Sequence, residues 1–394
     1  MHSLLTKIHA ARGAGICPPD RLPHYWLTFL PYRFTTVGFA RRLCPMAPTY
    51  PQPPKSIIEF SQHFATEDAC ADYLFSLRYP NGYECSKCGS VRAWRVKEKP
   101  GMMICENNHK VSVTAGTSLA GTKQSLTLWF HAAWLVATLK PGISAVQFQR
   151  QLGLTRLETA WTMLHKLRSG LFAPDRNGLS SDCADGLHTD HWIEVDEVLV
   201  GGKEEGVEHR GGGAETKTLI AVAVEVHSWY GLTSDRNATD TKRRTRTSGE
   251  TRAGRCRMSV IADTRAETLT EFVCGNIAPG STIWTDASRS YNQCEREGYP
   301  RRKTIAKDDP DPLPTLGRVT TNLKRWLIGT HKGAVQPQHL QAYLNEFVFR
   351  FNRRDIPWVA FNRALGLAAL NRPAVEYEGL YKHTWVHPNA SPNR

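Results

Sequence analysis

Two aspartates stand where neighbouring strands would carry them, and their placement points to divalent-metal chemistry. Asp196 lies inside the apolar run 192–200, and Asp286 directly follows the apolar run 281–285. Burying an ionised carboxylate is costly unless it is paired or faces a metal. On adjacent strands, two carboxylates can share divalent ions about 3.5–4 Å apart, which activate an oxygen nucleophile and stabilise the leaving oxygen of a phosphodiester. Mg²⁺ or Mn²⁺ fits such a site, because these ions prefer oxygen ligands. For either aspartate alone, a capping or turn role is the alternative.

A third ligand should come from the helix expected after Asp286. The polar residue available there is Asn322, 36 positions downstream, whose amide oxygen can bind a metal without adding charge. Glu346, on a predicted helix further along, and Glu197, beside Asp196, are the alternative sources of the missing negative charge.

A second group of residues has the spacing of a zinc site. Cys85 and Cys88 form a Cys-x-x-Cys knuckle, and sixteen residues separate Cys88 from Cys105. Zn²⁺ takes four thiolate or imidazole ligands in a tetrahedron. Because Asn108 occupies the position of a second knuckle cysteine, we predict His109 as the fourth ligand. The alternative is a ribbon that folds without metal.

Composition limits the class of protein. The 394-residue chain has 50 Lys and Arg against 37 Asp and Glu, a formal charge of +13 that favours an anionic partner. At about 100–200 residues per domain, this length allows two or three domains. No run approaches the ~18 uninterrupted apolar residues of a membrane helix. The cysteines occur without a secretory signal pattern, which favours a reducing, cytoplasmic location.

A helical region is predicted after the cysteines. Residues 144–152, Gly153 and residues 155–168 follow the pattern of a helix-turn-helix, whose second helix can enter a major groove. That second helix carries Arg156, Lys166 and Arg168, which we predict to contact DNA. A helical hairpin that binds no DNA is the alternative.

The second half of the chain changes to strands, and its predicted elements follow the order of an RNase H-like domain. We expect strands at 192–200, 218–226 and 258–262, a helix at 266–276, a fourth strand at 281–285, and helices from about 320 to 352. The fold class is therefore α/β, with an RNase H-like mixed sheet preceded by a small zinc ribbon and a helix-turn-helix-like region.

Basic residues cluster in two places in this half. A loop at 233–257 is rich in Lys and Arg and is either a solvated loop or a non-specific phosphate contact. The C-terminal helices carry further cations that suit phosphates, with a solvated helix face as the alternative: Lys324, Arg325, Arg350, Arg353 and Arg354.

These patterns divide the chain into five segments. They are a basic, proline-rich extension at 1–55, in which Met46 is a possible true start; a helical lead-in and zinc ribbon at 56–120; a helical region at 121–180; an RNase H-like domain at 190–372; and a tail at 373–394.

Several of these stretches resemble one known family. They are Cys85-x-x-Cys88, Val113-Thr-Ala-Gly-Thr117, Glu194-Val-Asp-Glu197 with Gly201-Gly202, Thr285-Asp286, the run from Asn322 to His331, and the run from Tyr343 to Arg354. The combination, which extends from about residue 60 to 372, resembles the zinc-ribbon DDE transposases of bacterial insertion sequences, in the IS1595 (ISXO2-like) group.

The resemblance implies a function. In this family an RNase H-like domain cuts and joins DNA at element ends, which by match assigns catalysis to Asp196, Asp286 and Asn322. The ribbon and the adjacent helices, here residues 85–109 and 143–168, would bind terminal inverted repeats. It further implies target DNA as a partner, a homo-oligomer in the active complex and a place on the nucleoid.

Two other functions fit the same features. One is a catalytically inactive zinc-ribbon and helix-turn-helix regulator that binds DNA. The other is an RNase H-like nuclease that hydrolyses DNA without strand transfer.

Overall fold

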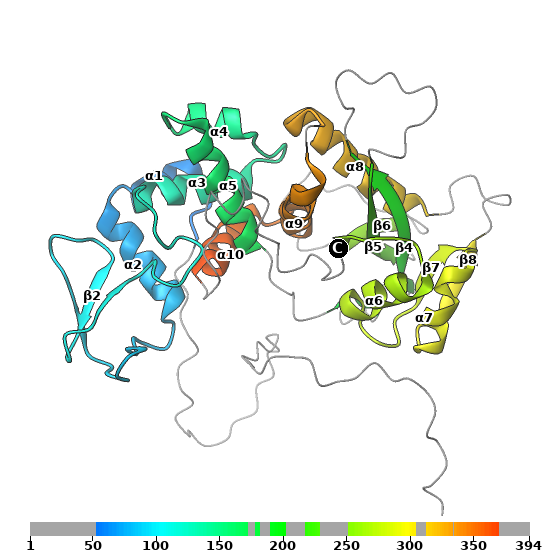
Figure 1. Cartoon of the computed structure of the whole chain (residues 1–394), viewed down its shortest axis with the longest axis horizontal. Helices are drawn as coiled ribbons and strands as arrows, with labels where there is room; N and C mark the ends of the chain where they lie inside the picture. The colour runs from blue at the N-terminus through cyan, green and yellow to red at the C-terminus, as the bar shows by residue number, and fades with distance from the viewer. Residues whose placement is uncertain are drawn as a thin grey trace, which may run out of the picture.

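A computed structural model of the chain describes residues 53–171, 178–181, 190–201, 217–228, 251–304, 313–333 and 335–369. A helical part with a small sheet and a part built on a larger sheet lie side by side, with α9 between them and α8 over the larger sheet (Figure 1). Almost all of the predicted extension 1–55, including Met46, and the predicted tail 373–394 lie outside the described residues. Within the described ranges, no helix is long and apolar enough to cross a membrane.

The helical part is built from α1 (Ile57–His63), α2 (Glu67–Arg78), α3 (Leu126–Thr138), α4 (Ala145–Gln151), α5 (Leu157–Leu171) and α10 (Pro357–Ala369). Four of these helices begin at a hydroxyl N-cap that accepts a hydrogen bond from a backbone N–H of the first turn: Ser56, Thr66, Ser125 and Ser144. Gly153, with φ of +62°, makes the turn between α4 and α5, so the predicted helix pair is present. Helix α10 returns from the C-terminal end of the chain to pack Phe361 into the core with Phe60 and Trp134.

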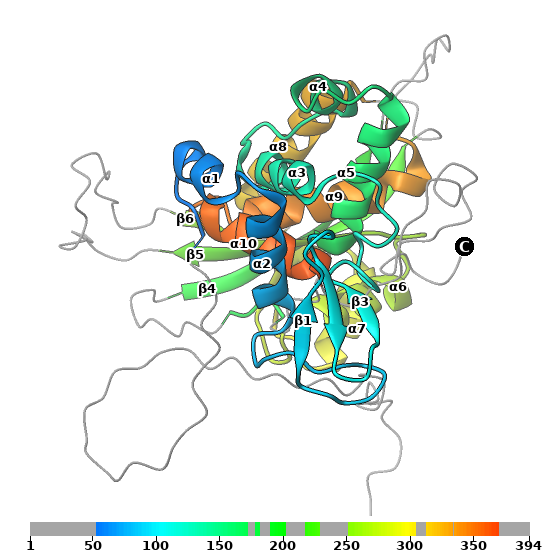
Figure 2. The same ribbon diagram turned by 90° about the vertical axis from the view of Figure 1, so that its left-hand side faces the viewer.

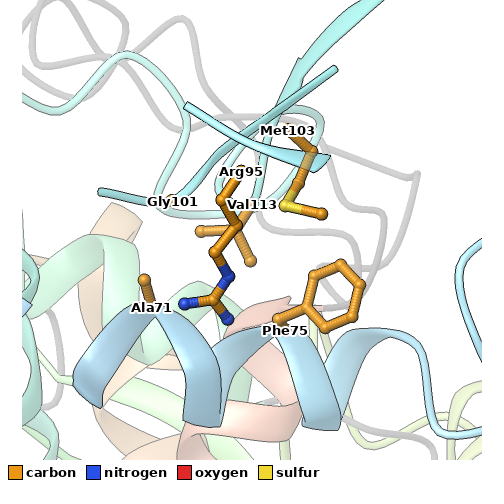
Figure 3. A pocket seen from close by; sticks show the side chains of 6 residues that line it. All are labelled: Ala71, Phe75, Arg95, Gly101, Met103 and Val113. Atoms are coloured by element: carbon orange, nitrogen blue, oxygen red, sulfur yellow. The ribbon is translucent and has the colours of Figure 1, made fainter. Parts of the chain in front are cut away.

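The small sheet packs against α2. It consists of β1 (Ala93–Arg95), β2 (Met102–Cys105) and β3 (Lys110–Ser112), paired antiparallel in that order. Met103 and Val113 lie over Ala71 and Phe75 of α2, as Figure 3 shows. On the same side, Arg95 forms an ion pair with Asp72 of α2. The ribbon is therefore held against the helical core on one face.

The larger sheet has five strands in the order β6-β5-β4-β7-β8. They are β4 (Asp190–Val200), β5 (Thr218–Ser228), β6 (Thr251–Val260), β7 (Ile283–Asp286) and β8 (Arg301–Thr304). The three long strands pair antiparallel, whereas β4 with β7 and β7 with β8 pair parallel. This mixed sheet confirms the predicted RNase H-like arrangement.

Helices cover both faces of the sheet. α6 (Ala266–Asn276) and α7 (Asn292–Arg296) pack in one apolar cluster with residues such as Ile193 and Ile283. α8 (Pro314–His331) and α9 (Pro337–Asn352) pack on the opposite face with residues such as Val200 and Val222. Figure 2 shows the helical part in front of this layered arrangement.

The strand boundaries differ from the sequence prediction in two places. β6 begins at Thr251 rather than at 258, so the last residues of the predicted basic loop 233–257 belong to a strand, while residues 229–250 lie outside the description. β8 was not predicted, because its sequence Arg301-Arg-Lys-Thr304 is polar. Pairing with β7, rather than apolar alternation, places these residues in the sheet.

Helix α9 covers the free edge of β6 with polar side chains. The Asn352 amide accepts a hydrogen bond from the Cys256 N–H (2.8 Å) and donates one to the Cys256 carbonyl (3.1 Å). Further along, Gln341 accepts from the Val260 N–H (2.8 Å). An uncovered edge strand offers unpaired backbone groups to other chains, and α9 satisfies part of this edge.

A buried ion pair joins the helical part to the sheet part. Arg168 of α5 donates to Glu346 of α9 at 2.7 Å, and the two side chains are 1% and 0% exposed. Arg350 lies 3.5 Å from the same carboxylate, and the Arg168 guanidinium stacks 4.1 Å from the Tyr343 ring centroid. The Arg168 and Arg350 charges lower the pKa of Glu346 against the opposing effect of its burial, which is the larger single influence.

Replacing Glu346 with Gln should destabilise the protein by about 3–5 kcal/mol, because the substitution leaves the Arg168 charge buried without its partner. Urea denaturation followed by tryptophan fluorescence measures the change. As a control, Glu106→Gln removes one member of the exposed Arg92–Glu106 pair and should cost less than about 1 kcal/mol. Equal effects of the two substitutions would contradict the structural role of the buried pair.

Candidate functional site

The register of β4 and β7 brings the two predicted aspartates opposite each other. Ile193 pairs with Ile283, and Glu194 pairs with Trp284. Because both strands run in the same direction, continuing this register by two residues aligns Asp196 with Asp286.

Both aspartates also face the same side of the sheet. Side chains alternate between faces along a strand. Ile193 and Ile283 pack with α6, whereas Trp284 packs with the cluster of α8 and α9. Asp196 and Asp286, three positions beyond the isoleucines, therefore lie on the α8 side. The arrangement places two acidic side chains on adjacent strands at one face of the sheet.

The electrostatics of Asp196 suit a cation. Burial raises the pKa of Asp196 to about 6, and the charges of Glu197 and Asp286 add to the effect, against a hydrogen bond from the Glu197 N–H. In the described part of the chain, no lysine or arginine offsets this charge. Oxygen donors with uncompensated negative charge fit Mg²⁺ or Mn²⁺.

The helix that carries Asn322 is attached to the strand that carries Asp196. Leu313 provides no side-chain cap for α8, and the carboxylate of Glu194 on β4 instead accepts from the Leu316 N–H at 2.6 Å. A carboxylate at this end of a helix also interacts favourably with the helix dipole. Asn322 lies one to two turns further along α8 and is exposed. The described contacts do not bring it to the aspartates.

The two alternative acids point elsewhere. Glu197 follows Asp196 directly and therefore faces the opposite side of the sheet, where its carboxylate accepts a hydrogen bond from the Tyr291 hydroxyl at 2.7 Å. Glu346 is fully buried in the ion pair with Arg168. In this structure neither carboxylate joins the face shared by Asp196 and Asp286.

The predicted zinc ligands do come together. The ligand atoms of Cys85, Cys88, Cys105 and His109 all lie within 4.8 Å of one another. This is the chemistry of a structural zinc site, in which three thiolates and one imidazole surround the ion. Backbone N–H groups of the first knuckle, with that of Lys87 foremost, lower the pKa of Cys85 to about 6.

The backbone explains how His109 takes the fourth position. Asn108 adopts a left-handed conformation with φ of +60°, which asparagine tolerates better than most residues. The Cys105 N–H bonds to the His109 carbonyl (3.0 Å), and the His109 N–H bonds to the Cys105 sulfur (3.3 Å). The second knuckle is thus one residue longer than the first and still closes around Cys105.

Of the three DNA contacts predicted for the second helix of the pair, Arg156 directly precedes α5, whereas Lys166 and Arg168 lie on it. Two of the three are at the surface or near it, and one is not. Arg156 is exposed, and Lys166 is half-buried with its ammonium group donating to the Ala120 carbonyl. Both line a pocket of about 380 Å³, together with Lys123. Arg168 is only 1% exposed and ion-paired to Glu346, which corrects its assignment as a DNA contact.

The predicted DNA-contacting cations of the C-terminal helices also fall into two groups, those exposed to solvent and those engaged in contacts within the protein. Lys324 and Arg325 are exposed on α8. Arg350 donates to the Leu139 and Lys140 carbonyls and is 10% exposed. Arg354 donates to the carbonyls of Ala253 and Gly254 on β6, and the Arg353 guanidinium lies 4.3 Å from the Phe349 ring centroid. Arg350 and Arg354 thus connect α9 and the residues after it to neighbouring segments, whereas Arg353 contacts Phe349 of α9 itself.

Two residues near Asp286 were missed by sequence reasoning. Arg301 donates to the carbonyls of Asp286 and Ser288, and Tyr291 donates to Glu197. Arg301 stands in an unpredicted strand, and an arginine in a polar run carries no sign of burial. Tyr291 sits five residues after Asp286, and this proximity was the only available signal.

Replacing Asp196 with Asn should stabilise the metal-free protein at pH 7.5 by about 1–2 kcal/mol, because it removes a buried charge repelled by its neighbours. A carboxyl group whose pKa is raised in the folded state destabilises that state above this pKa. The advantage of the variant should therefore shrink as the pH falls through about 6. Thermal denaturation at pH 7.5 and pH 5 tests this, and an unstable variant at pH 7.5 would contradict it.

Comparisons with known proteins agree with this geometry. A family model described as ISXO2-like transposase domain matches residues 189–352, which carry both aspartates, and a model described as transposase zinc-ribbon domain matches residues 65–107. Together they cover more than half of the chain. Searches of curated proteins and of solved structures found no match. Since both matching models describe the IS1595 group, the chain belongs to the IS1595 family of zinc-ribbon DDE transposases.

Proposed function

We propose that this transposase binds the terminal inverted repeats of its element, cleaves the DNA to free 3′-hydroxyl ends and joins those ends to target DNA. Asp196 and Asp286 would hold the divalent ions. The resemblance of the sequence to the family implies Asn322 as the third ligand, and this side chain is exposed on α8, whose beginning Glu194 fixes to β4. The observation that carries the proposal is the parallel register of β4 and β7 with both aspartates on one face.

The chain's own residues have a defined part in this chemistry. Asp196 and Asp286 provide negative charge on one face of the sheet, and among the residues that the structure describes no basic side chain offsets the charge of Asp196. Mg²⁺ bound there would activate the attacking oxygen and stabilise the leaving oxygen of the phosphodiester. No covalent enzyme intermediate is needed, because water and then the 3′-hydroxyl serve as nucleophiles. The exposed Lys324 and Arg325 on α8 suit the DNA backbone near the same face.

The helical part and the ribbon supply recognition in this proposal. Arg156 and Lys123 line an open pocket beside α5, and α4 with α5 forms the predicted helix-turn-helix. Phosphate contacts from such residues fix the position of a protein on DNA, whereas base contacts specify the sequence.

Replacing Asp196 or Asp286 with Asn should reduce strand transfer by roughly a hundredfold or more, because each substitution removes one charged metal ligand. The assay combines the protein, a duplex bearing the flanking inverted repeat, a plasmid target and Mg²⁺ or Mn²⁺. Binding to the inverted repeat should remain, since the recognition residues lie in other elements.

The control is Glu271→Gln, which removes an exposed acid from α6 on the opposite face of the sheet and should leave joining unchanged. The outcomes separate the rival functions. A nuclease would hydrolyse DNA without joining it and without preference for repeat ends. A regulator would bind the repeat and neither nick nor join, and such a result would refute the catalytic proposal.

The purified protein should carry about one Zn²⁺ per chain, and Cys88→Ser or His109→Ala should lower this content, because each removes one of four ligands. Elemental analysis of the purified proteins measures the loss. Hydrogen exchange should quicken in β1 to β3, since the ribbon's own buried cluster is limited to Tyr83, Cys85 and Cys105.

Cys274→Ser provides the control, because this cysteine lies on α6 in the catalytic part. Its zinc content should equal that of the unaltered protein. If His109→Ala kept full zinc content while Cys88→Ser lost it, His109 would not be the fourth ligand.

A further inference from the structure

A buried polar network lies on the face of the sheet opposite to Asp196 and Asp286. Its first contact is the hydrogen bond of 2.7 Å that the Tyr291 hydroxyl donates to Glu197. Tyr291 is fully buried among the residues packed under α6. Because Glu197 adjoins Asp196 on β4, this bond fixes the strand directly beside the first aspartate.

The second contact fixes the end of β7. Arg301 reaches from β8 across the adjacent strand, and its side chain is fully buried. Its guanidinium donates to the Thr285 hydroxyl (2.7 Å), the Asp286 carbonyl (2.6 Å) and the Ser288 carbonyl (2.8 Å). The backbone that carries Asp286 is thus held from behind. Its carboxylate lies on the other face, where one oxygen accepts a hydrogen bond from the Ser288 N–H at 3.0 Å.

The Tyr291 contact and the Arg301 contact are connected, because the two side chains also lie close to each other. The Arg301 guanidinium lies 5.4 Å from the centroid of the Tyr291 ring, within the range of a cation–π interaction. A continuous path therefore runs from Glu197 through Tyr291 and Arg301 to the backbone of Asp286. It connects the two strands at the level of the aspartates without passing through the face where the ions would bind.

We propose that Tyr291 and Arg301 are positioning residues that hold Asp196 and Asp286 at the separation that divalent ions require. This inference rests on the proposed function of the aspartates. Two like charges on adjacent strands repel each other, so the metal-free site would open unless other contacts hold the strands in place. Buried hydrogen bonds behind metal ligands commonly serve this purpose and set metal affinity.

Tyr291→Phe is the most conservative test, because it removes the hydroxyl that reaches Glu197 and keeps the buried ring. The variant should bind Mn²⁺ about tenfold more weakly. Titration calorimetry of the full-length protein measures this affinity, with Asp196→Asn as the baseline for ions bound elsewhere. Strand transfer should need a correspondingly higher Mn²⁺ concentration, while the concentration of repeat DNA for half-maximal rate stays unchanged.

Tyr299→Phe is the matched control. Tyr299 is also buried in the cluster under α6, and its hydroxyl donates to the Ile277 carbonyl at 3.0 Å. The two substitutions remove the same group from similar surroundings, so a purely structural effect would be shared. Equal Mn²⁺ affinities in the two variants would overturn the inference.

Arg301→Lys provides a second variant. Lysine keeps the positive charge and loses the planar fork, which donates here to oxygens of Thr285, Asp286, Ser288 and Asn292. Hydrogen exchange should quicken at residues 284–292 in the metal-free variant, and Mn²⁺ binding should weaken at least as much as in Tyr291→Phe. Unchanged exchange together with unchanged affinity would also refute the inference.

The results distinguish this inference from the proposed function. Wild-type protein that binds Mn²⁺ through Asp196 but never joins DNA would refute strand transfer and still allow the two tyrosine variants to be compared. Wild-type protein whose Mn²⁺ binding equals that of Asp196→Asn would refute both, since there would be no ion to position.

Discussion

Two carboxylates of like charge stand opposite each other at one face of a parallel strand pair, and their repulsion has to be resisted by the surrounding fold. In water such a pair would separate or take up a proton. Here the strands are tied into a five-stranded sheet, α8 is capped by Glu194 from the same strand, and Arg301 holds the turn after Asp286. The destabilisation caused by Asp196 is the cost of a site ready for a divalent ion.

Helices α8 and α9 connect this site to the rest of the molecule. α8 is fixed to β4 through Glu194 at its beginning, and near its end Thr330 donates to the Pro141 carbonyl in the loop between α3 and α4. α9 holds Arg168 of the predicted recognition helix through Glu346. A movement of α5 would therefore be opposed by a buried ion pair, which solvent screens little, so this pair couples the helical part to the sheet part.

Local sequence signals predicted the elements well where one residue type has one physical meaning. The cysteine spacing predicted the ribbon, the glycine between two helical patterns predicted the α4–α5 pair, and an acid inside an apolar strand singled out Asp196. Prediction failed where a distant partner decides the outcome. Arg168 and Glu346 are 178 positions apart, and β8 exists because β7 pairs with it. No local sequence pattern could have predicted the Arg168–Glu346 ion pair or the pairing of β8 with β7.

The same limit applies to the positive charge of the chain. Its sum of +13 is a property of composition, but the attraction of DNA depends on which cations face solvent. Arg168 and Arg350 are enclosed around Glu346, Arg354 bonds to the edge of β6, and Arg301 is turned into the sheet. The charges of these arginines are therefore engaged by partners within the protein rather than presented to solvent. Among the described residues, electrostatic attraction must therefore rest on exposed cations such as Arg156, Lys324 and Arg325. Lys324 and Arg325 lie on α8, whose beginning Glu194 fixes to β4, and Arg156 directly precedes α5, which the buried ion pair holds to α9.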